Sequence, residues 1–286
     1  MAKIVSSGKA LHSTEYHEKK KKVMLRRWIF SGVIILIIIA IPILILRISG
    51  LRVDTVEVAG ANVLDSKRLV EVVESRLGEN YLWVIPKNSF FLLPRRGIKK
   101  TLQQEFPRIK SIGLNLLDTE TLVVNIEERT PLALYCKEVV DSTNVSDCYF
   151  MDEEGFVFSE APYFSGDVYL VFSIRMGSED LLGQNFLTPL EFENLLRFIE
   201  SVREYGVHTR ILEFVPETPS GQGKYVLHFS NGGQIFWYSN DDLTLVESGL
   251  KSLLLSDAVG EKEDFLKQVE YIDLTIPNKV YWRLKK

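Results

Sequence analysis

An uncharged apolar stretch near the start of the sequence limits the folds open to the rest of the chain. Residues 28–46, WIFSGVIILIIIAIPILIL, are 19 residues without a charged side chain. As an α-helix they extend about 28 Å, which matches the hydrocarbon thickness of a bilayer. Pro42 does not argue against a spanning helix, because such helices tolerate proline. We therefore predict a transmembrane helix over residues 28–46.

A cleaved secretory signal is the alternative explanation of this stretch. The apolar region of such a signal is shorter, and small residues follow it at the cleavage site. Here RISGLRVD follows, with bulky or charged residues where small ones are needed. We expect the helix to be retained as a single-pass anchor in the cell (plasma or inner) membrane.

The charges that flank the predicted span indicate its orientation. Residues 1–27 carry eight Lys or Arg and two Asp or Glu. Basic flanks remain in the cytoplasm, so we predict a cytoplasmic basic tail over 1–27 and extracytoplasmic domains over 47–286. With a formal charge of −4 for the whole chain, residues 47–286 carry −10. An acidic region does not favour nucleic acid as a partner, since phosphate binding needs a basic surface.

The two cysteines, Cys136 and Cys148, both lie in the predicted external region. Oxidising compartments allow disulfides, and an even pair that flanks one polar loop is most simply explained by a bridge that closes the loop. Two unrelated buried thiols are the alternative. The spacing offers too few ligands for a zinc site.

The first external segment predicts a strand, two helices and two more strands. Alternating valines in LRVDTVEVAGANVL predict a half-buried strand, and these are Val53, Val56 and Val58. Helical spacing follows over residues 66–77 and in RRGIKKTLQQEF, while a turn near 118–120 separates two strands. Residues 79–94 lack a clean period, so we expect an irregular connection there. The β-α-α-β-β order predicts a compact α+β domain over 47–130.

The remainder of the sequence predicts a mixed β-domain with covering helices over residues 131–286. YFMDEEGFVFSE has the pattern of two strands around a solvated acidic turn, and Asn231-Gly232-Gly233 is a strong hairpin signal. Two helices are expected, one in TPLEFENLLRFIESVREYG and one in LTLVESGLKSLLLSDAV, the second interrupted by Gly249. Two short strands around Pro277-Asn278 end the sequence.

These motifs, in this order, resemble the bacterial cell division proteins FtsQ and DivIB. The resemblance includes the basic tail, the single anchor, the strand VDTVEVAGANVL, the pair FPRIKSIGLNLLDTETLVVNIEERTPLALY, the turn YFMDEEGFVF and the hairpin YIDLTIPNKVYW. It covers nearly the whole chain. It implies a POTRA domain at 47–130, an FtsQ-type β-domain at 131–286, a location at the division septum, and a scaffold that recruits and regulates division proteins. The implied partners are FtsB-like and FtsL-like proteins.

The sequence contains no recognisable catalytic or cofactor-binding motif. It has no phosphate-binding G-x-x-x-x-G-K-[ST], no nucleophile elbow and no zincin helix, and its four histidines are dispersed. We therefore expect neither catalysis nor a cofactor, a metal or a small-molecule substrate. A membrane-anchored envelope enzyme with dispersed catalytic residues and a POTRA-bearing protein-export component remain as alternatives.

The candidate partner-binding residues lie in two places. The free edge of the final strand is expected to accept an added strand from an FtsB-like protein, and its residues are Lys279, Val280, Tyr281, Trp282 and Arg283, with Tyr271 and Asp273 on the preceding strand. A finishing strand protected from aggregation by its cations is the simpler interpretation. In the first domain, Val53, Val56 and Val58 are expected to offer a docking surface, unless that domain only spaces the second from the membrane.

Overall fold

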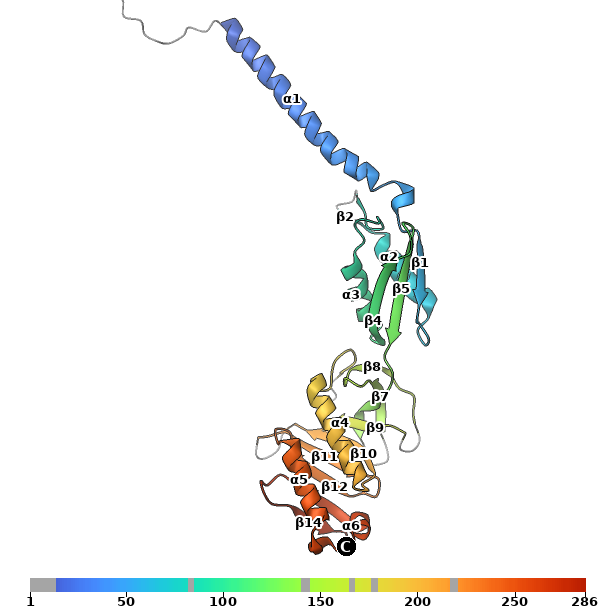
Figure 1. Cartoon of the computed structure of the whole chain (residues 1–286), viewed down its shortest axis with the longest axis vertical. Coiled ribbons are helices and arrows are strands. Elements are labelled where there is room, and N and C mark those ends of the chain that lie inside the picture. Colours follow the sequence, from blue (N-terminus) through green and yellow to red (C-terminus); the bar gives the residue numbers. More distant parts are fainter. Residues whose placement is uncertain (1–13, 82–84, 140–144, 165–167, 176–179, 217–220) are drawn as a thin grey trace, which may run out of the picture. The chain divides into compact units, whose positions relative to one another are not determined.

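The computed structural model in Figure 1 is that of an α+β protein. It describes residues 14–81, 85–139, 145–164, 168–175, 180–216 and 221–286. Part of the predicted basic tail, residues 1–13, and the centre of the loop between the cysteines, residues 140–144, lie outside the described residues. The described residues contain six α-helices.

By compactness the chain divides into two units, each assembled from separate stretches of sequence. One unit consists of Met1–Ala59, Leu64–Lys99 and Gly113–Asn125, and the other of Gly60–Val63, Lys100–Ile112 and Ile126–Lys286. A nine-stranded sheet belongs entirely to the second unit.

Helix α1, Thr14–Ile45, contains the predicted membrane span. Within it, Lys20–Ile45 is long and apolar enough to cross a membrane. Large side chains such as Trp28, Phe30 and Leu36 are 71%, 64% and 66% exposed, as lipid-facing side chains are. The helix begins in the predicted tail and ends one residue before the predicted boundary, where Leu46 N donates to Pro42 O.

The three-stranded sheet has the order β1-β5-β4, with β1 parallel to β5. The elements around it are η1 (Ser49–Leu51), β1 (Thr55–Ala59), α2 (Ser66–Leu77), β2 (Asn80–Tyr81), β3 (Ile85–Pro86), α3 (Arg95–Glu105), β4 (Ile109–Leu116) and β5 (Thr121–Glu128). Asp65 caps α2 by accepting a hydrogen bond from Lys67 N, and its buried side chains, Leu69, Val73 and Leu77, follow the predicted helical spacing. Within the segment expected to be irregular, Asn80–Tyr81 and Ile85–Pro86 pair as antiparallel strands, which are too short to produce a period.

The second sheet is mixed and has nine strands in the order β14-β13-β12-β11-β10-β9-β6-β7-β8. Its strands are β6 (Ala133–Val139), β7 (Val145–Met151), β8 (Val157–Glu160), β9 (Leu170–Ile174), β10 (Thr209–Val215), β11 (Lys224–Phe229), β12 (Gln234–Tyr238), β13 (Val269–Asp273) and β14 (Tyr281–Leu284). Strand β9 is parallel to both of its neighbours, β6 and β10, and β12 is parallel to β13. Strands β14 and β8 therefore form the two edges.

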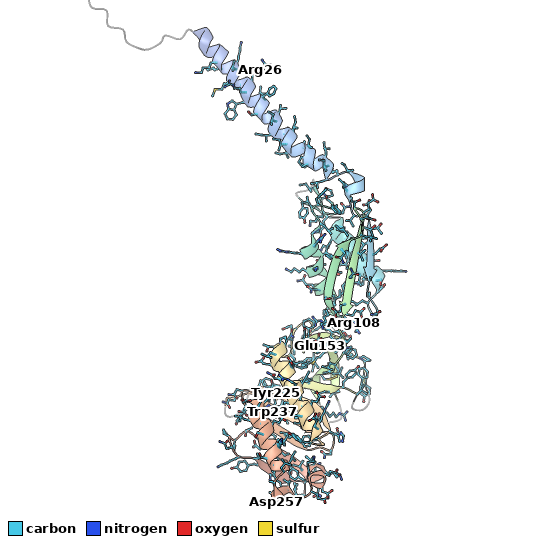
Figure 2. The ribbon with its side chains drawn as sticks, in the orientation of Figure 1. Arg26, Arg108, Glu153, Tyr225, Trp237 and Asp257 are labelled. Atoms are coloured by element: carbon cyan, nitrogen blue, oxygen red, sulfur yellow. A yellow bond between two sulfur atoms is a disulfide. The ribbon has the colours of Figure 1, made fainter. Side chains whose placement is uncertain are left out.

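Three helices pack on one face of this sheet, not the predicted two. They are α4 (Pro189–Glu204), α5 (Leu243–Leu254) and α6 (Lys262–Gln268), with a short η2 (Asp257–Val259) between the last two. All three helices contribute side chains to one core cluster with the sheet. Tyr225 and Trp237, labelled in Figure 2, belong to that core. Their ring centroids are 5.6 Å apart. Helix α6 has only seven residues, so it leaves a weak periodic signal.

Gly249 does not interrupt α5, contrary to the prediction. A Cβ at Gly249 would lie 3.6 Å from Leu274 Cδ2 and 3.7 Å from Val280 Cγ2. The residue therefore marks the place where the segment between β13 and β14 approaches the helix closely.

The acidic turn between β7 and β8 is only partly solvated, which corrects a further expectation. Asp152 is 2% exposed and forms an ion pair with Arg129. Its Oδ1 accepts hydrogen bonds from Glu154 N at 2.9 Å and Phe156 N at 3.0 Å. Only Glu153 and Glu154 face solvent. Asp152 thus builds the turn through these hydrogen bonds and its ion pair.

A disulfide joins Cys136 on β6 to Cys148 on β7, which stand directly opposite each other in the strand register. Cys136 is fully buried in a small cluster with Leu134, Val171 and Ile211. The bridge therefore links two neighbouring strands of the sheet as well as closing the loop.

Candidate functional site

The candidate site is the hairpin of β13 and β14, whose connecting turn follows from local sequence. Lys279 N donates to Ile276 O at 3.1 Å, which closes a four-residue turn. Pro277 occupies its second position and Asn278 its third, with φ at 61°, as a type II turn requires. Beyond the turn, Tyr281 pairs with Asp273 and Trp282 with Ile272.

The register shows which backbone groups of β14 point to the sheet edge. Lys285 N donates to Gln268 O at 2.8 Å, so residue 285 points toward the hairpin partner. Because backbone groups of alternate residues share a direction, those of Tyr281 and Arg283 also point inward. The N–H and C=O groups of Trp282 and Leu284 then point outward. Within the described residues, β13 is the sole strand that pairs with β14.

The side chains of β14 divide between the two faces of the sheet as alternation predicts. Val280 and Trp282 pack against the core, and the Trp282 ring meets Phe265 of α6 edge-on at 5.3 Å. Tyr281 is 48% exposed on the opposite face, beside the exposed Arg283. Leu284 is exposed although it follows the core side of the alternation.

A row of aromatic and cationic side chains crosses the face of the sheet opposite the helices. The Lys224 ammonium lies 4.7 Å from the Phe236 ring centre. Phe236 stacks against Tyr271 at 5.7 Å, and the Arg283 guanidinium lies 5.0 Å from the Tyr271 ring centre. We call these four residues, Lys224, Phe236, Tyr271 and Arg283, the cation–aromatic row. Aromatic and Arg side chains are the types enriched at protein interfaces.

The charge of Arg283 is partly compensated within the hairpin. Its Nε donates to Glu270 Oε2 at 2.7 Å, and its Nη2 donates to the other carboxylate oxygen. These hydrogen bonds lower the pKa of the Glu270 carboxyl and raise the pKa of Arg283. Lys285 donates to the carbonyl oxygen of Asn231. A partner at this edge would therefore meet a weaker positive field than the sequence suggests.

A groove of about 620 Å³ lies beside the hairpin, between α5 and the residues that join β13 to β14. Leu245 on the helix and Ile276 on the turn line it, and they are 71% and 42% exposed. It offers apolar contact area next to the open edge.

The predicted partner-binding residues therefore have different structural roles. Tyr281, Arg283 and Lys279 are exposed, and Tyr271 joins the cation–aromatic row. Val280 and Trp282 hold the hairpin to the core. The Asp273 carboxylate accepts from Thr275 N at 2.9 Å and from Thr275 Oγ1 at 2.6 Å, so it shapes the connecting segment.

Sequence reasoning missed Lys224, Phe236 and Glu270 as parts of this surface. Strand alternation places Lys224 and Phe236 on the face away from the core, but only the strand order brings them next to Tyr271.

The valines of the first domain fit a docking surface only in part. Val53 is 3% exposed, which contradicts its assignment to a contact surface. Its N–H donates to Asn88 O at 2.8 Å, and its carbonyl accepts from the Asn88 amide, so this backbone pairing holds it inside. Val56 and Val58 are half-buried on β1, an edge of the three-stranded sheet.

A charged cluster on the nine-stranded sheet is the closest approach to a catalytic arrangement. Glu213 is 7% exposed and accepts from Arg175 Nε at 2.7 Å, while His228 Nε2 lies 3.3 Å away. Burial raises the pKa of Glu213, but hydrogen bonds from His228 and Arg175 outweigh it and lower the pKa to about 2. Such a carboxylate is a weak base at neutral pH, so the cluster is best explained as a stabilising ion network.

Comparisons with known proteins do not identify a family. No protein-family model matches the chain, and no curated protein matches it. Among the described residues, no group of three or more His, Cys, Asp or Glu side chains could hold a metal ion. Function must therefore be inferred from the sheet edge and the surfaces beside it.

Proposed function

We propose that this chain is a membrane-anchored scaffold of the bacterial division machinery, similar to FtsQ and DivIB. In this proposal residues 47–286 lie outside the cytoplasm at the division septum, and the protein binds FtsB-like and FtsL-like partners. The observation that carries it is the open edge of β14, flanked by exposed Tyr281 and by the cation–aromatic row.

The remaining architecture supports the same proposal. Apart from the two-residue strands β2 and β3, the order β1, α2, α3, β4 and β5 agrees with the β-α-α-β-β order that the resemblance implies, and a mixed β-domain with covering helices follows it. One apolar helix precedes both. A reporter fused after Lys286 should be active only outside the cytoplasm if the orientation is as proposed.

Strand addition explains how such an edge binds a partner. An added strand would pair with the outward N–H and C=O groups of Trp282 and Leu284, which give affinity with little dependence on sequence. Tyr281, the exposed aromatic side chain, would add specificity, since tyrosine is a frequent binding hot spot. Because Glu270 compensates Arg283, a preference for acidic residues in the partner would depend mainly on Lys279 and Lys286.

Leu284 allows a test that separates backbone pairing from side-chain contact. Leu284→Pro removes the outward N–H, whereas Leu284→Ala keeps it and shortens the same exposed side chain. Neither substitution removes an inward hairpin bond. With the full chain in nanodiscs, we expect Leu284→Pro to weaken binding of the FtsB-like partner by about tenfold or more relative to Leu284→Ala. Thermal unfolding of both variants checks the fold.

Equal binding by folded Leu284→Pro and Leu284→Ala proteins would refute strand addition at β14. The cellular role is tested by depletion: cells that lose the protein should grow as filaments. Wild-type protein should restore division, and Leu284→Pro should restore it less well than Leu284→Ala. Normal division after depletion would refute the role itself.

A further inference from the structure

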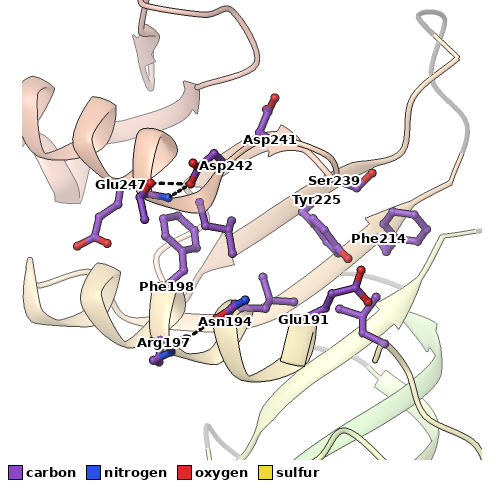
Figure 3. Close-up of a pocket in the computed structure, with 14 residues that line it drawn as sticks. Glu191, Asn194, Arg197, Phe198, Phe214, Tyr225, Ser239, Asp241, Asp242 and Glu247 are labelled. Carbon is purple, nitrogen blue, oxygen red and sulfur yellow. Dashed lines mark hydrogen bonds between the residues drawn. The ribbon is translucent and has the colours of Figure 1, made fainter. Parts of the chain in front are cut away.

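A second groove, distinct from the β14 edge, lies where the beginnings of α4 and α5 meet strands β10 and β11 and the residues after β12 (Figure 3). Its volume is about 690 Å³, within the range of roughly 300–1,000 Å³ typical of ligand sites. Three aromatic side chains form part of its wall, those of Phe198, Phe214 and Tyr225. Phe198 also packs on Trp237 at 4.9 Å, so the wall is continuous with the core and firmly held.

Tyr225 places a hydroxyl group among the aromatic rings of this wall. The residue is only 7% exposed, and its hydroxyl has no hydrogen-bond partner among the residues that the structure describes. Figure 3 shows the hydroxyl directed toward the Glu191 carboxylate. Burial, with Glu191 adding to it, raises the pKa of Tyr225 to about 12, so the hydroxyl stays neutral and can both donate and accept. The hydroxyl is not among the fully buried atoms that lack a partner, and Tyr225 lines the groove, so a polar ligand group can reach it.

The groove also carries excess negative charge. Four carboxylates line it, those of Glu191, Asp241, Asp242 and Glu247, against one guanidinium, that of Arg197. Two of them serve helix starts: Glu191 closes the capping box of α4 and Asp242 caps α5. Each helix start offsets about half a charge, and Arg197 offsets one more. About two negative charges therefore remain for a ligand.

We propose that this groove binds an arginine side chain presented by an extended segment of another protein. A planar guanidinium can stack on the part-exposed Phe214 ring, which also lines the groove, and donate to the Glu191 carboxylate. It can also donate to the Tyr225 hydroxyl. Lysine lacks the planar fork and fits less well. This inference does not depend on the division role or on the β14 edge.

The size of the groove and the charge of the chain select this occupant over others. A groove of about 690 Å³ holds much more than one guanidinium, so neighbouring residues of the partner segment fill the rest. A second copy of the chain is a poor partner, because residues 47–286 carry −10 in total and two such regions repel each other.

The test uses the full chain in nanodiscs and a fluorescent pentapeptide mixture with arginine fixed at the centre and uncharged random flanks. A second mixture carries citrulline in place of arginine, which keeps the shape and removes the charge. We expect binding of the arginine mixture to weaken with added salt. The affinity of the citrulline mixture should be lower by about tenfold or more.

Two variants locate the binding in the groove. Tyr225→Phe removes only the hydroxyl, and Glu191→Gln removes the charge while glutamine can still complete the capping box. Each should weaken arginine-mixture binding by at least about threefold to tenfold. Glu204→Gln is the matched control, since Glu204 is an exposed acid on the same helix that does not line the groove. It should leave binding unchanged.

Four results would overturn the proposal. These are no binding of the arginine mixture up to about 1 mM, equal binding of the citrulline mixture, equal effects of Glu191→Gln and Glu204→Gln, and wild-type affinity in Tyr225→Phe. Sedimentation separates self-association: a concentration-dependent dimer that Glu191→Gln abolishes would assign the groove to a second copy instead. Loss of β14 binding through Leu284→Pro should not affect these measurements, so the two sites are tested independently.

Discussion

The two edge strands of the nine-stranded sheet, β8 and β14, differ in whether other segments hydrogen-bond to their outward backbone groups. At β8, the backbone of Val157 donates to Gln184 O at 2.9 Å and accepts from Gly183 N at 2.8 Å. Phe186 N extends this cover by donating to Gly155 O. At β14, the outward backbone groups of Trp282 and Leu284 meet no such segment among the described residues.

This difference distinguishes β14 from the covered start of β8. Proteins commonly cover or charge their sheet edges to prevent unwanted pairing. Here the chain covers one edge with its own residues and leaves the other with cations and an aromatic side chain, Tyr281. An edge that can accept a partner strand needs that combination, because the cations discourage self-pairing while the backbone stays available.

The two edges also differ in how their ion pairs contribute to stability, and the largest expected effect tests this. The side chains of Arg129 and Asp152 at the covered edge are 11% and 3% exposed, whereas those of Arg283 and Glu270 at the open edge are 58% and 40% exposed. Arg129→Met leaves the Asp152 carboxylate buried without its cation, so we expect a loss of about 3–5 kcal/mol in the free energy of unfolding. Arg283→Met should cause no resolvable loss, because solvent screens that pair.

Denaturant unfolding of the full chain in detergent measures both variants. Similar losses at the two edges would contradict the comparison. The Arg283→Met variant also tests the cation–aromatic row, because it removes one of its cations. Partner binding should weaken, while the free energy of unfolding should stay the same.

A pH dependence at the centre of the sheet, on β10, separates acid sensitivity from both edges. The pKa of Glu213 is lowered to about 2 from its ordinary 4.5. Its stabilising contribution is complete above pH 4.5 and is lost as pH falls through 2, by at most about 3 kcal/mol. In Glu213→Gln the free energy of unfolding should change less between these pH values than in the wild type. An unchanged acid profile would show that another carboxylate controls it.

The smallest expected difference compares two glycines with positive φ. Gly155 stands at the covered edge with φ at 74°, and a Cβ there would lie 2.7 Å from Phe192 Cγ. Gly232 has φ at 84°, but its nearest contact would be Lys285 Nζ at 3.8 Å. Gly232→Ala should lose about 1–2 kcal/mol from backbone strain alone, and Gly155→Ala a further 1–3 kcal/mol or so from overpacking. Thermal melts measure the difference, and equal losses would argue against a tightly packed covered edge.

Local patterns predicted most elements of the fold. Helix α2 spans the predicted residues 66–77, and the strands on both sides of residues 118–120 form as expected. These elements have complete periods and recognisable caps or turns, which act over a few neighbouring residues. The predictions failed where tertiary contacts decide: Val53 is held inside by Asn88, and α5 continues through Gly249, where the connecting segment after β13 approaches it.

The sequence by itself determined the apolar helix, the turn at Pro277 and Asn278, and the alternation that puts Trp282 and Tyr281 on opposite faces, because each depends on neighbouring residues only. The tertiary structure decided which strands lie side by side. Strand order placed Phe236 and Tyr271 in contact, covered β8 with residues 183–186, and left β14 at an edge. Pairing between strands that are distant in the sequence depends on the packing of the whole core, so a local sequence pattern does not predict it.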